Sequence, residues 1–243
     1  PATGTIDTGD GADDIILNEA LAAGGTIDGG AGSNDELTIN ANVTAGSVTN
    51  VESINVGSAT VDLGNITGET DVNVLANAVA TITALPTDEV DVGANATLIV
   101  ADASGTTINL DGAGNLTVDI DDAAVTSATI DLGSGGTLTF DTTQSAAPTA
   151  TPALAQLTLT SSGNVTLAGT SAAANTAVEV TDLDVSGVSG TFQTAAVGPA
   201  NAFTGLTNFE GAAGADTFAV TTSQGTFNLN DGADSVTFTT MAG

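Results

Sequence analysis

The sequence contains no lysine, arginine or histidine, and this absence excludes several classes of function. The 29 acidic residues give the 243-residue chain a formal net charge of −29 at pH 7. Without cationic side chains the protein has no means of neutralising phosphates, so we predict that it does not bind nucleic acid. Anionic lipid surfaces repel it for the same reason. No apolar run is long enough to cross a bilayer, so we also predict no membrane insertion.

Cysteine, tryptophan and tyrosine are also absent. Their absence excludes a disulfide scaffold, and zinc, haem and iron–sulfur sites lose their usual ligands. Acid–base and nucleophilic catalysis would have to rely on carboxylates and hydroxyls alone, so we predict that the protein is not an enzyme. Cations that prefer hard oxygen ligands, calcium above all, keep their full set of ligand types.

What the sequence does contain is a regular alternation of apolar and polar residues, which predicts β-strands. Hydrophobic residues make up 41% of the chain, which is ample for a folded core. Gly, Asn, Asp and Ser separate the alternating segments and predict turns. The clearest strands are expected at residues 107–111, 116–120, 129–132, 137–140 and 157–160. Only residues 15–23 are predicted to form a helical turn or two.

The strands and turns recur together at spacings near 20 residues. Residues 5–11 match 26–32 after 21 residues, 107–119 match 129–141 after 22, and 108–118 match 157–167 after 49. Repeats of this length predict an all-β fold, and we favour a β-solenoid, similar to a β-helix, in which each repeat is one coil of a stack. A series of β-sandwich domains stays open as an alternative, because successive hairpins give similar spacings.

The composition predicts three regions along the chain. A β-rich repeat region is expected at 1–144, followed by a Pro/Ala/Thr linker or long loop at 145–156. A second β-rich region is expected at 157–243. The linker prediction rests on Pro148 and Pro152 and on the lack of large apolar residues around them.

Four turns combine glycine with aspartate at a recurring offset. They lie at residues 8–16, 29–37, 211–219 and 229–237. Glycine permits positive φ and exposes carbonyl oxygens, while an Asp two or three residues after the last Gly brings a carboxylate into the same concavity. Carbonyls and carboxylates at short range suit calcium, which takes about six to eight oxygen ligands. Ordinary β-turns capped by Asp remain the alternative for each turn, although self-repulsion among the acidic residues favours a bound cation.

These turns resemble the calcium-binding nonapeptide of the RTX (repeats-in-toxin) family, G-G-x-G-x-D-U-x-x, in which U is a large apolar residue. Leu206-Thr-Asn-Phe-Glu210 and Val48-Thr-Asn-Val-Glu52 are similar to the L-x-N-U-E element that often precedes such turns. The composition, rich in Thr, Ala, Gly and Asp, also resembles that of bacterial surface-layer (S-layer) proteins. The resemblance implies a secreted protein that binds Ca²⁺ through its turns.

The turn chemistry and the resemblance together give a set of predicted Ca²⁺ ligands. The predicted carboxylate ligands are Asp10, Asp13, Asp14, Asp28, Asp35, Asp216, Asp231 and Asp234, and the predicted carbonyl ligands are Gly9, Gly30, Gly32 and Gly211. Two further acidic groups are expected to be solvated strand edges rather than ion sites. They are Asp119 with Asp121 and Asp122, and Asp88 with Glu89 and Asp91.

We therefore predict an extracellular structural protein at the cell surface, a calcium-stabilised subunit that self-assembles into a bacterial surface layer or an extracellular filament. Its main partner would be itself, with cell-surface polysaccharide as a further candidate. The alternative is an adhesin or binding module of a large RTX-type secreted protein that recognises a glycan, a surface or ice. Three Thr-x-Thr segments, at 81–83, 137–139 and 158–160, would form an ice-binding ladder if they stacked in register.

Overall fold

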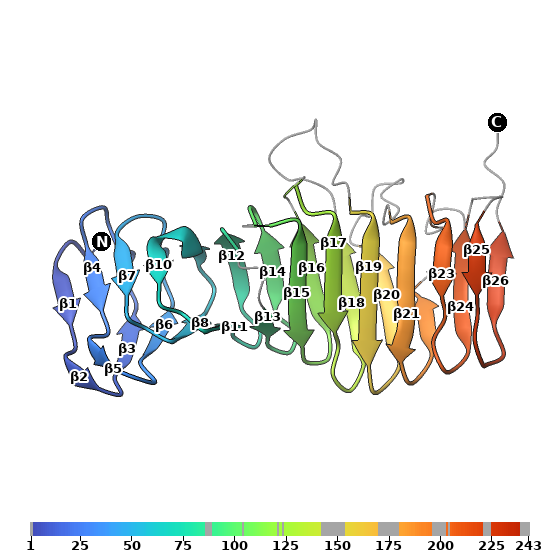
Figure 1. Cartoon of the computed structure of the whole chain (residues 1–243), viewed down its shortest axis with the longest axis horizontal. Helices are drawn as coiled ribbons and strands as arrows, with labels where there is room; N and C mark the ends of the chain where they lie inside the picture. The colour runs from blue at the N-terminus through green and yellow to red at the C-terminus, as the bar shows by residue number, and fades with distance from the viewer. Residues whose placement is uncertain are drawn as a thin grey trace.

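The protein is a β-solenoid in which parallel strands wind into coils stacked along one long axis (Figure 1). The computed structural model describes residues 2–85, 89–103, 105–120, 122, 124–141, 154–169, 180–195, 203, 205–220 and 225–238. All strand pairs in these ranges are parallel, which confirms the predicted solenoid and excludes the antiparallel β-sandwich.

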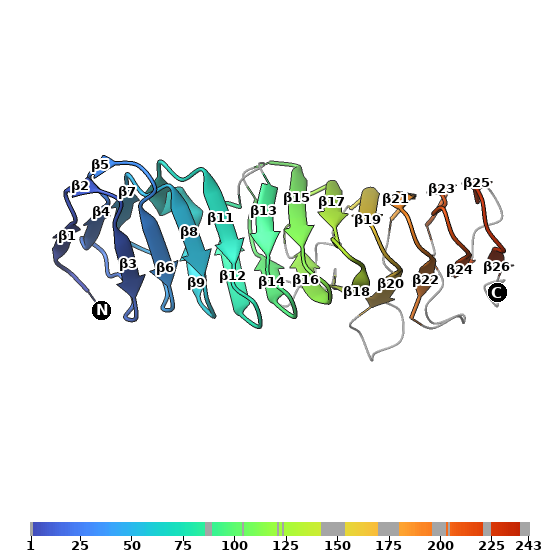
Figure 2. The same ribbon diagram turned by 90° about the horizontal axis from the view of Figure 1, so that it is seen from below.

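Two long sheets form the walls of the stack: an 11-stranded sheet that runs from the first coil to the last described one, and a 9-stranded sheet that begins at β9 (Figure 2). The 11-stranded sheet contains, in spatial order, β3 (Asp14–Leu17), β6 (Glu36–Ile39), β8 (Ser53–Val56), β11 (Asp71–Val74), β13 (Glu89–Val92), β15 (Thr107–Gly112), β17 (Ser127–Asp131), β19 (Gln156–Ser161), β21 (Asp182–Val188), β23 (Asn208–Glu210) and β25 (Thr226–Asn228). The 9-stranded sheet contains β9 (Thr60–Asp62), β12 (Val79–Thr83), β14 (Thr97–Val100), β16 (Leu116–Ile120), β18 (Gly136–Asp141), β20 (Val165–Gly169), β22 (Phe192–Thr194), β24 (Asp216–Val220) and β26 (Ser235–Phe238).

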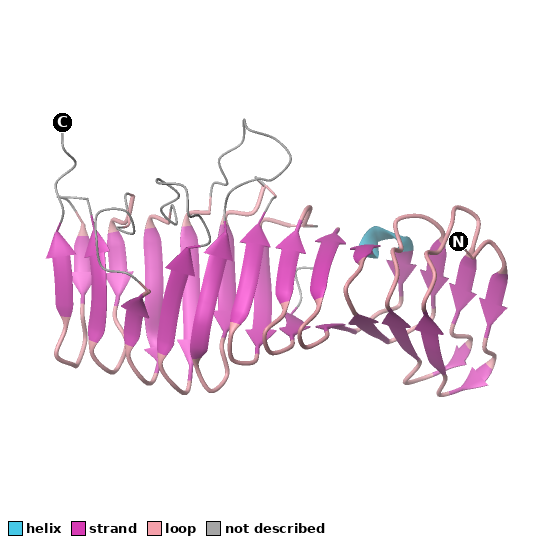
Figure 3. Cartoon of the chain, turned by 180° about the vertical axis from the view of Figure 1, so that it is seen from behind, coloured by secondary structure: helices cyan, strands magenta, loops and turns pink. Residues whose placement is uncertain are grey.

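The N-terminal coils have an additional sheet. It contains β1 (Thr5–Asp7), β4 (Thr26–Asp28), β7 (Ser47–Thr49) and β10 (Ile66–Thr67), and the two-residue strands β2 (Asp10–Gly11) and β5 (Ala31–Gly32) pair beside it. Within the described ranges, helical structure is limited to one 3-10 turn, Leu63–Asn65 (Figure 3). No helix in the described ranges is long and apolar enough to span a membrane.

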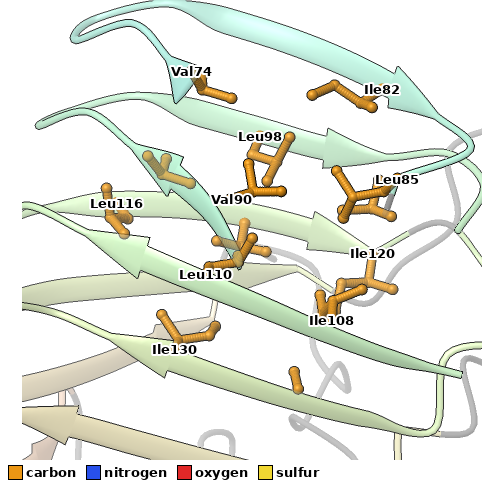
Figure 4. Packing of buried hydrophobic residues seen from close by; sticks show 14 of the residues in the cluster. Val74, Ile82, Leu85, Val90, Leu98, Ile108, Leu110, Leu116, Ile120 and Ile130 are labelled. Carbon is orange, nitrogen blue, oxygen red and sulfur yellow. The ribbon is translucent and has the colours of Figure 1, made fainter. Parts of the chain in front are cut away.

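The core lies between the walls and consists of columns of apolar side chains, one from each coil. Val90, Leu110 and Ile130 pair in register on consecutive strands, and each is at most 2% exposed (Figure 4). Polar residues alternate with them and face outward, as the period of a strand requires. All five strands predicted from alternation are confirmed.

The predicted helical turns at residues 15–23 are wrong. Residues Asp14–Leu17 form strand β3, in which Ile15 and Leu17 are buried while Ile16 is 64% exposed. Leu21 makes a parallel bridge to the next coil. Pairing with a neighbouring coil therefore overrides the local helical preference of this segment.

The repeat alignments are confirmed in part. The 21-residue match holds throughout, because Thr5 pairs with Thr26 and Gly11 with Gly32. The 22-residue match holds from β16 to β18 but fails by two residues from β15 to β17, where Asn109 pairs with Thr129. The 49-residue match shows the converse, since it holds for β15 and β19 but not for β16 and β20. The corners between strands differ by two residues, and an even shift keeps the same side chains facing the core.

Both predicted β-rich regions belong to the same two sheets. β17 pairs with β19 and β18 with β20, so the walls continue from the first region into the second. Of the predicted linker at 145–156, residues 145–153 lie outside the described ranges, and β19 begins at Gln156.

Candidate functional site

The first candidate site is a stack of three carboxylates at the corner before β3, β6 and β8. Asp13, Asp35 and Glu52 occupy the same position in consecutive coils, and we call them the N-terminal carboxylate stack. The backbone N–H of Asp13 donates to Asp35 Oδ1 over 2.8 Å, and the N–H of Asp35 donates to Glu52 Oε2 over 2.8 Å. Asp35 is 0% exposed. Within the described ranges, Oδ2 of Asp13 and Oδ2 of Asp35 are buried without a hydrogen-bond partner.

Glycines allow the turns of the first two coils to lie directly on one another. A Cβ at Gly30 would lie 1.9 Å from the carbonyl oxygen of Gly9, and a Cβ at Gly32 would lie 1.9 Å from that of Gly11. Gly29 leaves similar room beside Asp35, whose Oδ2 would lie 3.0 Å from an added Cβ. The turn backbones therefore pack closely on one another, next to the buried Oδ2 atoms of Asp13 and Asp35.

Asp28 supports the same turn from the neighbouring corner. Its Oδ1 accepts hydrogen bonds from the side-chain amide of Asn50 (2.8 Å) and from the backbone N–H of Gly30 (3.0 Å). The Asn50 amide, and to a smaller extent the Gly30 N–H, lower the pKa of Asp28 below its ordinary value because they stabilise the ionised form.

The second candidate site lies in the last two coils and consists of Asp216 and Asp234, which we call the C-terminal carboxylate stack. The backbone N–H of Asp216 donates to Asp234 Oδ1 over 3.0 Å, which repeats the geometry of the N-terminal carboxylate stack. Oδ2 of Asp216 accepts from the N–H of Ala212 over 3.1 Å. Asp216 is 0% exposed, and its Oδ1 is buried without a partner in the described ranges.

The surroundings of Asp216 disfavour its ionised form. Burial raises the pKa of Asp216 to about 6; the backbone N–H groups of Ala212 and Phe192 oppose this shift, and the charge of Asp234 adds to it. A Cβ at Gly211 would lie 2.4 Å from Asp216 Oδ2, so a side chain there would collide with the carboxylate. The carbonyl oxygen of Gly211 accepts a hydrogen bond from the Asn230 side chain over 2.6 Å.

The structure brings some of the predicted ligands together and leaves others apart. Asp13 meets Asp35, Asp28 meets Gly30, and Asp216 meets Gly211 and Asp234. Asp10, Asp14 and Asp231 are exposed, and Asp14 pairs in register with Glu36 on the outer face of β3 and β6. Sequence reasoning missed Glu52 as a member of a stack. The signal was present, because Glu52 ends the Val48–Glu52 element and stands directly before a strand, as Asp35 does.

A third acidic group lies on the outer face of the 11-stranded sheet. Carboxylate oxygens of Glu89, Asp91 and Asp111 lie within 4.8 Å of one another, close enough to hold a metal ion, and all three residues are exposed. Partial burial raises the pKa of Asp91, and the charges of Asp71 and Asp111 raise it further. The sequence indicated Glu89 and Asp91 as a solvated edge and missed Asp111, which comes from the next coil. Asp88 and Asp121 lie outside the described ranges.

The three Thr-x-Thr segments do not stack into one ladder. Residues 81–83 and 137–139 belong to the 9-stranded sheet, whereas 158–160 lie in β19 of the other sheet. Within the 9-stranded sheet a different column forms, because Thr97, Thr117 and Thr139 pair in register on consecutive coils.

Comparison of the chain with protein-family models, with curated proteins and with solved structures finds no match. The features that bear on function are therefore the composition, the solenoid and the carboxylate stacks.

Proposed function

We propose that the protein is an extracellular structural rod, a calcium-stabilised subunit that self-assembles into a bacterial surface layer or an extracellular filament. The observation that carries this proposal is the burial of carboxylate oxygens without partners, Asp35 Oδ2 and Asp216 Oδ1, in a chain without cationic side chains. A buried ionised carboxylate is destabilising by several kcal/mol unless an opposite charge accompanies it. Because the chain has no cationic side chain, a bound metal ion or a proton has to neutralise these groups.

The ligand chemistry favours calcium among the metal ions. The stacks offer carboxylate and carbonyl oxygens, the ligands that calcium takes in a flexible coordination sphere, and no nitrogen or sulfur side chain that zinc would require. Magnesium demands a stricter octahedral geometry and keeps several waters, which suits an enclosed glycine turn less well. The exposed group of Glu89, Asp91 and Asp111 offers three carboxylates to an ion on the outer wall.

The solenoid itself favours a structural role. Each coil contacts mainly its two neighbours, so the chain forms a stiff rod with long, repetitive walls. Calcium in the turns would join successive coils and reduce the repulsion between them. Calcium on the outer walls would bridge acidic surfaces of neighbouring rods, which would otherwise repel one another.

The test is a calcium titration followed by chelation, monitored by light scattering and negative-stain electron microscopy. We expect ordered sheets or fibres with calcium and their loss with chelator. The variant Asp35→Asn should require at least about tenfold more calcium, because it removes a buried ligand charge. The matched control Asp182→Asn lies on the outer side of β21 and should behave as the wild type. A protein that is equally folded and monodisperse with calcium and with chelator would overturn the proposal.

A second candidate function is a binding module, and the 9-stranded sheet favours it. The column of Thr97, Thr117 and Thr139 lies beside a surface hollow that Asn95 and Asn115 also line, and these residues carry no charge. Uncharged hydroxyls and amides can form hydrogen bonds to a neutral polysaccharide. A calcium-loaded monomer that never assembles but binds polysaccharide would favour this function over the structural one.

A further inference from the structure

The outer faces of the two long sheets differ in charge. In the 11-stranded sheet, carboxylates occupy outward positions on most strands, and several of them stand in register on consecutive coils. Asp14 pairs with Glu36, and Asp91 pairs with Asp111. We call this outer face the acidic wall. Because like charges repel one another, a second copy of the chain can meet the acidic wall only with cations between the two.

The outer face of the 9-stranded sheet is nearly uncharged. Its strands lie side by side along the rod (Figure 1), and hydroxyl, amide and small apolar side chains occupy most of their outward positions. In the described ranges, the acidic residues at outward positions of these strands are Asp62, Asp119 and its register partner Asp141. We call this outer face the neutral wall. The chain therefore places most of the charge of its two walls on one side.

The neutral wall is also regular, because its outward residues stand in register from coil to coil. Neighbouring strands lie about 4.8 Å apart, so each column repeats its hydroxyl or amide groups with that period. Two such columns are Thr97, Thr117 and Thr139, and Thr137, Thr166 and Gln193. A second surface matches the neutral wall row by row if it has the same period, and a second copy of this chain has it.

We propose that two copies of this chain pair face to face through their neutral walls. Such a pair is related by a two-fold axis, so each wall meets the identical wall of the other copy. Identical rows of small polar side chains can interdigitate when two sheets pack face to face. The contact would also cover Val79, which is 53% exposed.

The distribution of charge permits this pairing despite the net charge of −29 on each copy. The acidic wall lies on the far side of the core, about 10 Å from the neutral wall, which is the usual distance between packed sheets. At physiological ionic strength, charges separated by more than about 8 Å are largely screened. The two acidic walls therefore repel each other weakly in this arrangement, whereas pairing through the acidic walls would bring their carboxylates into contact.

The neutral wall is large enough for a stable pair. Nine strands at about 4.8 Å span about 40 Å along the rod, and a five-residue strand such as β12 gives a width of about 16 Å. Face-to-face contact over this area would bury up to roughly 1,300 Å² in total, within the range of about 1,200–2,000 Å² that specific interfaces bury. The pairing needs no calcium, so it goes beyond the proposed function and joins rods by a second kind of contact.

The test is sedimentation equilibrium of the whole chain at physiological ionic strength, in chelator and with calcium below the protein concentration at which sheets form. We expect a monomer–dimer equilibrium under both conditions. The double variant Thr117→Asp, Thr139→Asp should raise the dissociation constant of the pair at least about tenfold, because it places like charges opposite one another at the contact. The control Thr129→Asp, Thr158→Asp adds the same charge to the acidic wall, on the paired strands β17 and β19, and should leave the dissociation constant unchanged.

Three outcomes would overturn the pairing. The first is a wild type that is monomeric at every concentration under both conditions. The second is an equal effect of the two double variants in chains that circular dichroism shows to be folded. The third is a pair that forms only with calcium although the chain stays folded in chelator, because cations would then make the contact. A monomeric wild type that binds dextran, a neutral polysaccharide, through Thr117 and Thr139 would assign the neutral wall to the binding module instead.

The same measurements separate this inference from the proposed function. If calcium gives sheets or fibres but no pairs form at lower concentration, the pairing fails and the calcium-dependent structural role stands. If pairs form in chelator but calcium gives no larger assembly, the proposed function fails and the pairing stands.

Discussion

The first and the last described coils share the turn sequence Asp-Gly-Ala-Asp, at 10–13 and at 231–234, but the side chains that fill the core differ between the two regions. All seven phenylalanines lie at or after residue 140, so the N-terminal coils are filled by aliphatic side chains alone. In the C-terminal coils Phe192, Phe203, Phe209 and Phe218 form a continuous cluster with ring centroids 4.3–6.4 Å apart. The N-terminal coils have a third sheet that the C-terminal coils lack in the described ranges.

The geometry of the turn therefore does not depend on which apolar side chains fill the core beneath it. The N–H-to-carboxylate bond is the same in both stacks, although the side chains beneath the turns differ. In a solenoid each coil depends on its immediate neighbours, so damage to one end should stay at that end. Changes made separately at each end can test this independence.

The largest effect is expected from Phe218→Ala in the C-terminal coils. Phe218 is 0% exposed and contacts three other rings, so its loss should lower the free energy of unfolding of these coils by about 3–5 kcal/mol. Hydrogen exchange should show that amides in residues 182–238 lose protection while those in 26–56 keep it. Equal loss of protection at both ends would show that the two regions are not independent.

Much of the fold could be predicted because alternation and repetition are local properties of a sequence. The strand period of residues 107–111 and 116–120 can be recognised without knowing which strands lie beside them. The error at residues 15–23 has the opposite cause, because the pairing of Asp14–Leu17 with Glu36–Ile39 depends on a coil more than 20 residues away. The two-residue slips between repeats have the same origin, since corner length is not visible in a pattern of apolar residues.

Residues of the candidate site could be predicted only where a single turn contains both the glycine and the aspartate. Glycine followed by aspartate marked Asp35 and Asp216, which are the two fully buried carboxylates of the stacks. Asp111 escaped prediction because its partners Glu89 and Asp91 come from another coil. Glu52 escaped it because its role depends on standing in register with Asp35. Contacts between coils can be predicted only when the strand register is known, and the register became known only from the structure.

The second prediction tests whether the C-terminal carboxylate stack is a cation site. In chelator Asp216→Asn should stabilise the protein at pH 7.5 by at most about 3 kcal/mol, because the buried carboxylate has a pKa near 6 instead of 3.8. The stability that this carboxyl group contributes is fully present below about pH 3.8 and is lost as the pH rises through about 6. The advantage of the variant should therefore vanish in acid.

Calcium should reverse the sign of this effect. With calcium the wild type gains stability through the ionised Asp216, and the Asp216→Asn variant should melt at a lower temperature than the wild type. Thermal melts at pH 4 and pH 7.5, with calcium and with chelator, provide the measurement. A variant whose melting temperature matches that of the wild type under all four conditions would show that the Asp216 carboxylate neither destabilises the protein in chelator nor binds calcium.

The third prediction concerns close packing of the turns in the N-terminal coils. Gly30→Ala should lower stability by about 2 kcal/mol or more, because its Cβ would collide with the Gly9 carbonyl and its φ of 93° disfavours a side chain. Gly4→Ala is the matched control, since a Cβ at Gly4 would meet nothing within 4 Å, and it should change stability by less than about 0.5 kcal/mol. Denaturant unfolding measures both. Equal effects of the two substitutions would contradict the observed packing.

The smallest effect is expected at the hydrogen bond between Asn50 and Asp28. Asn50 has a φ of 55°, which glycine adopts freely, so Asn50→Gly removes the amide while it keeps the backbone conformation. The pKa of Asp28 should then rise toward its ordinary value, because its largest stabilising hydrogen bond is gone. Carboxyl chemical shifts followed through an acid titration measure this change directly. In the same spectra Asp216 should titrate as before, since the two residues lie in different regions of the rod, and a shift at Asp216 would show coupling between the ends that the stack of coils does not predict.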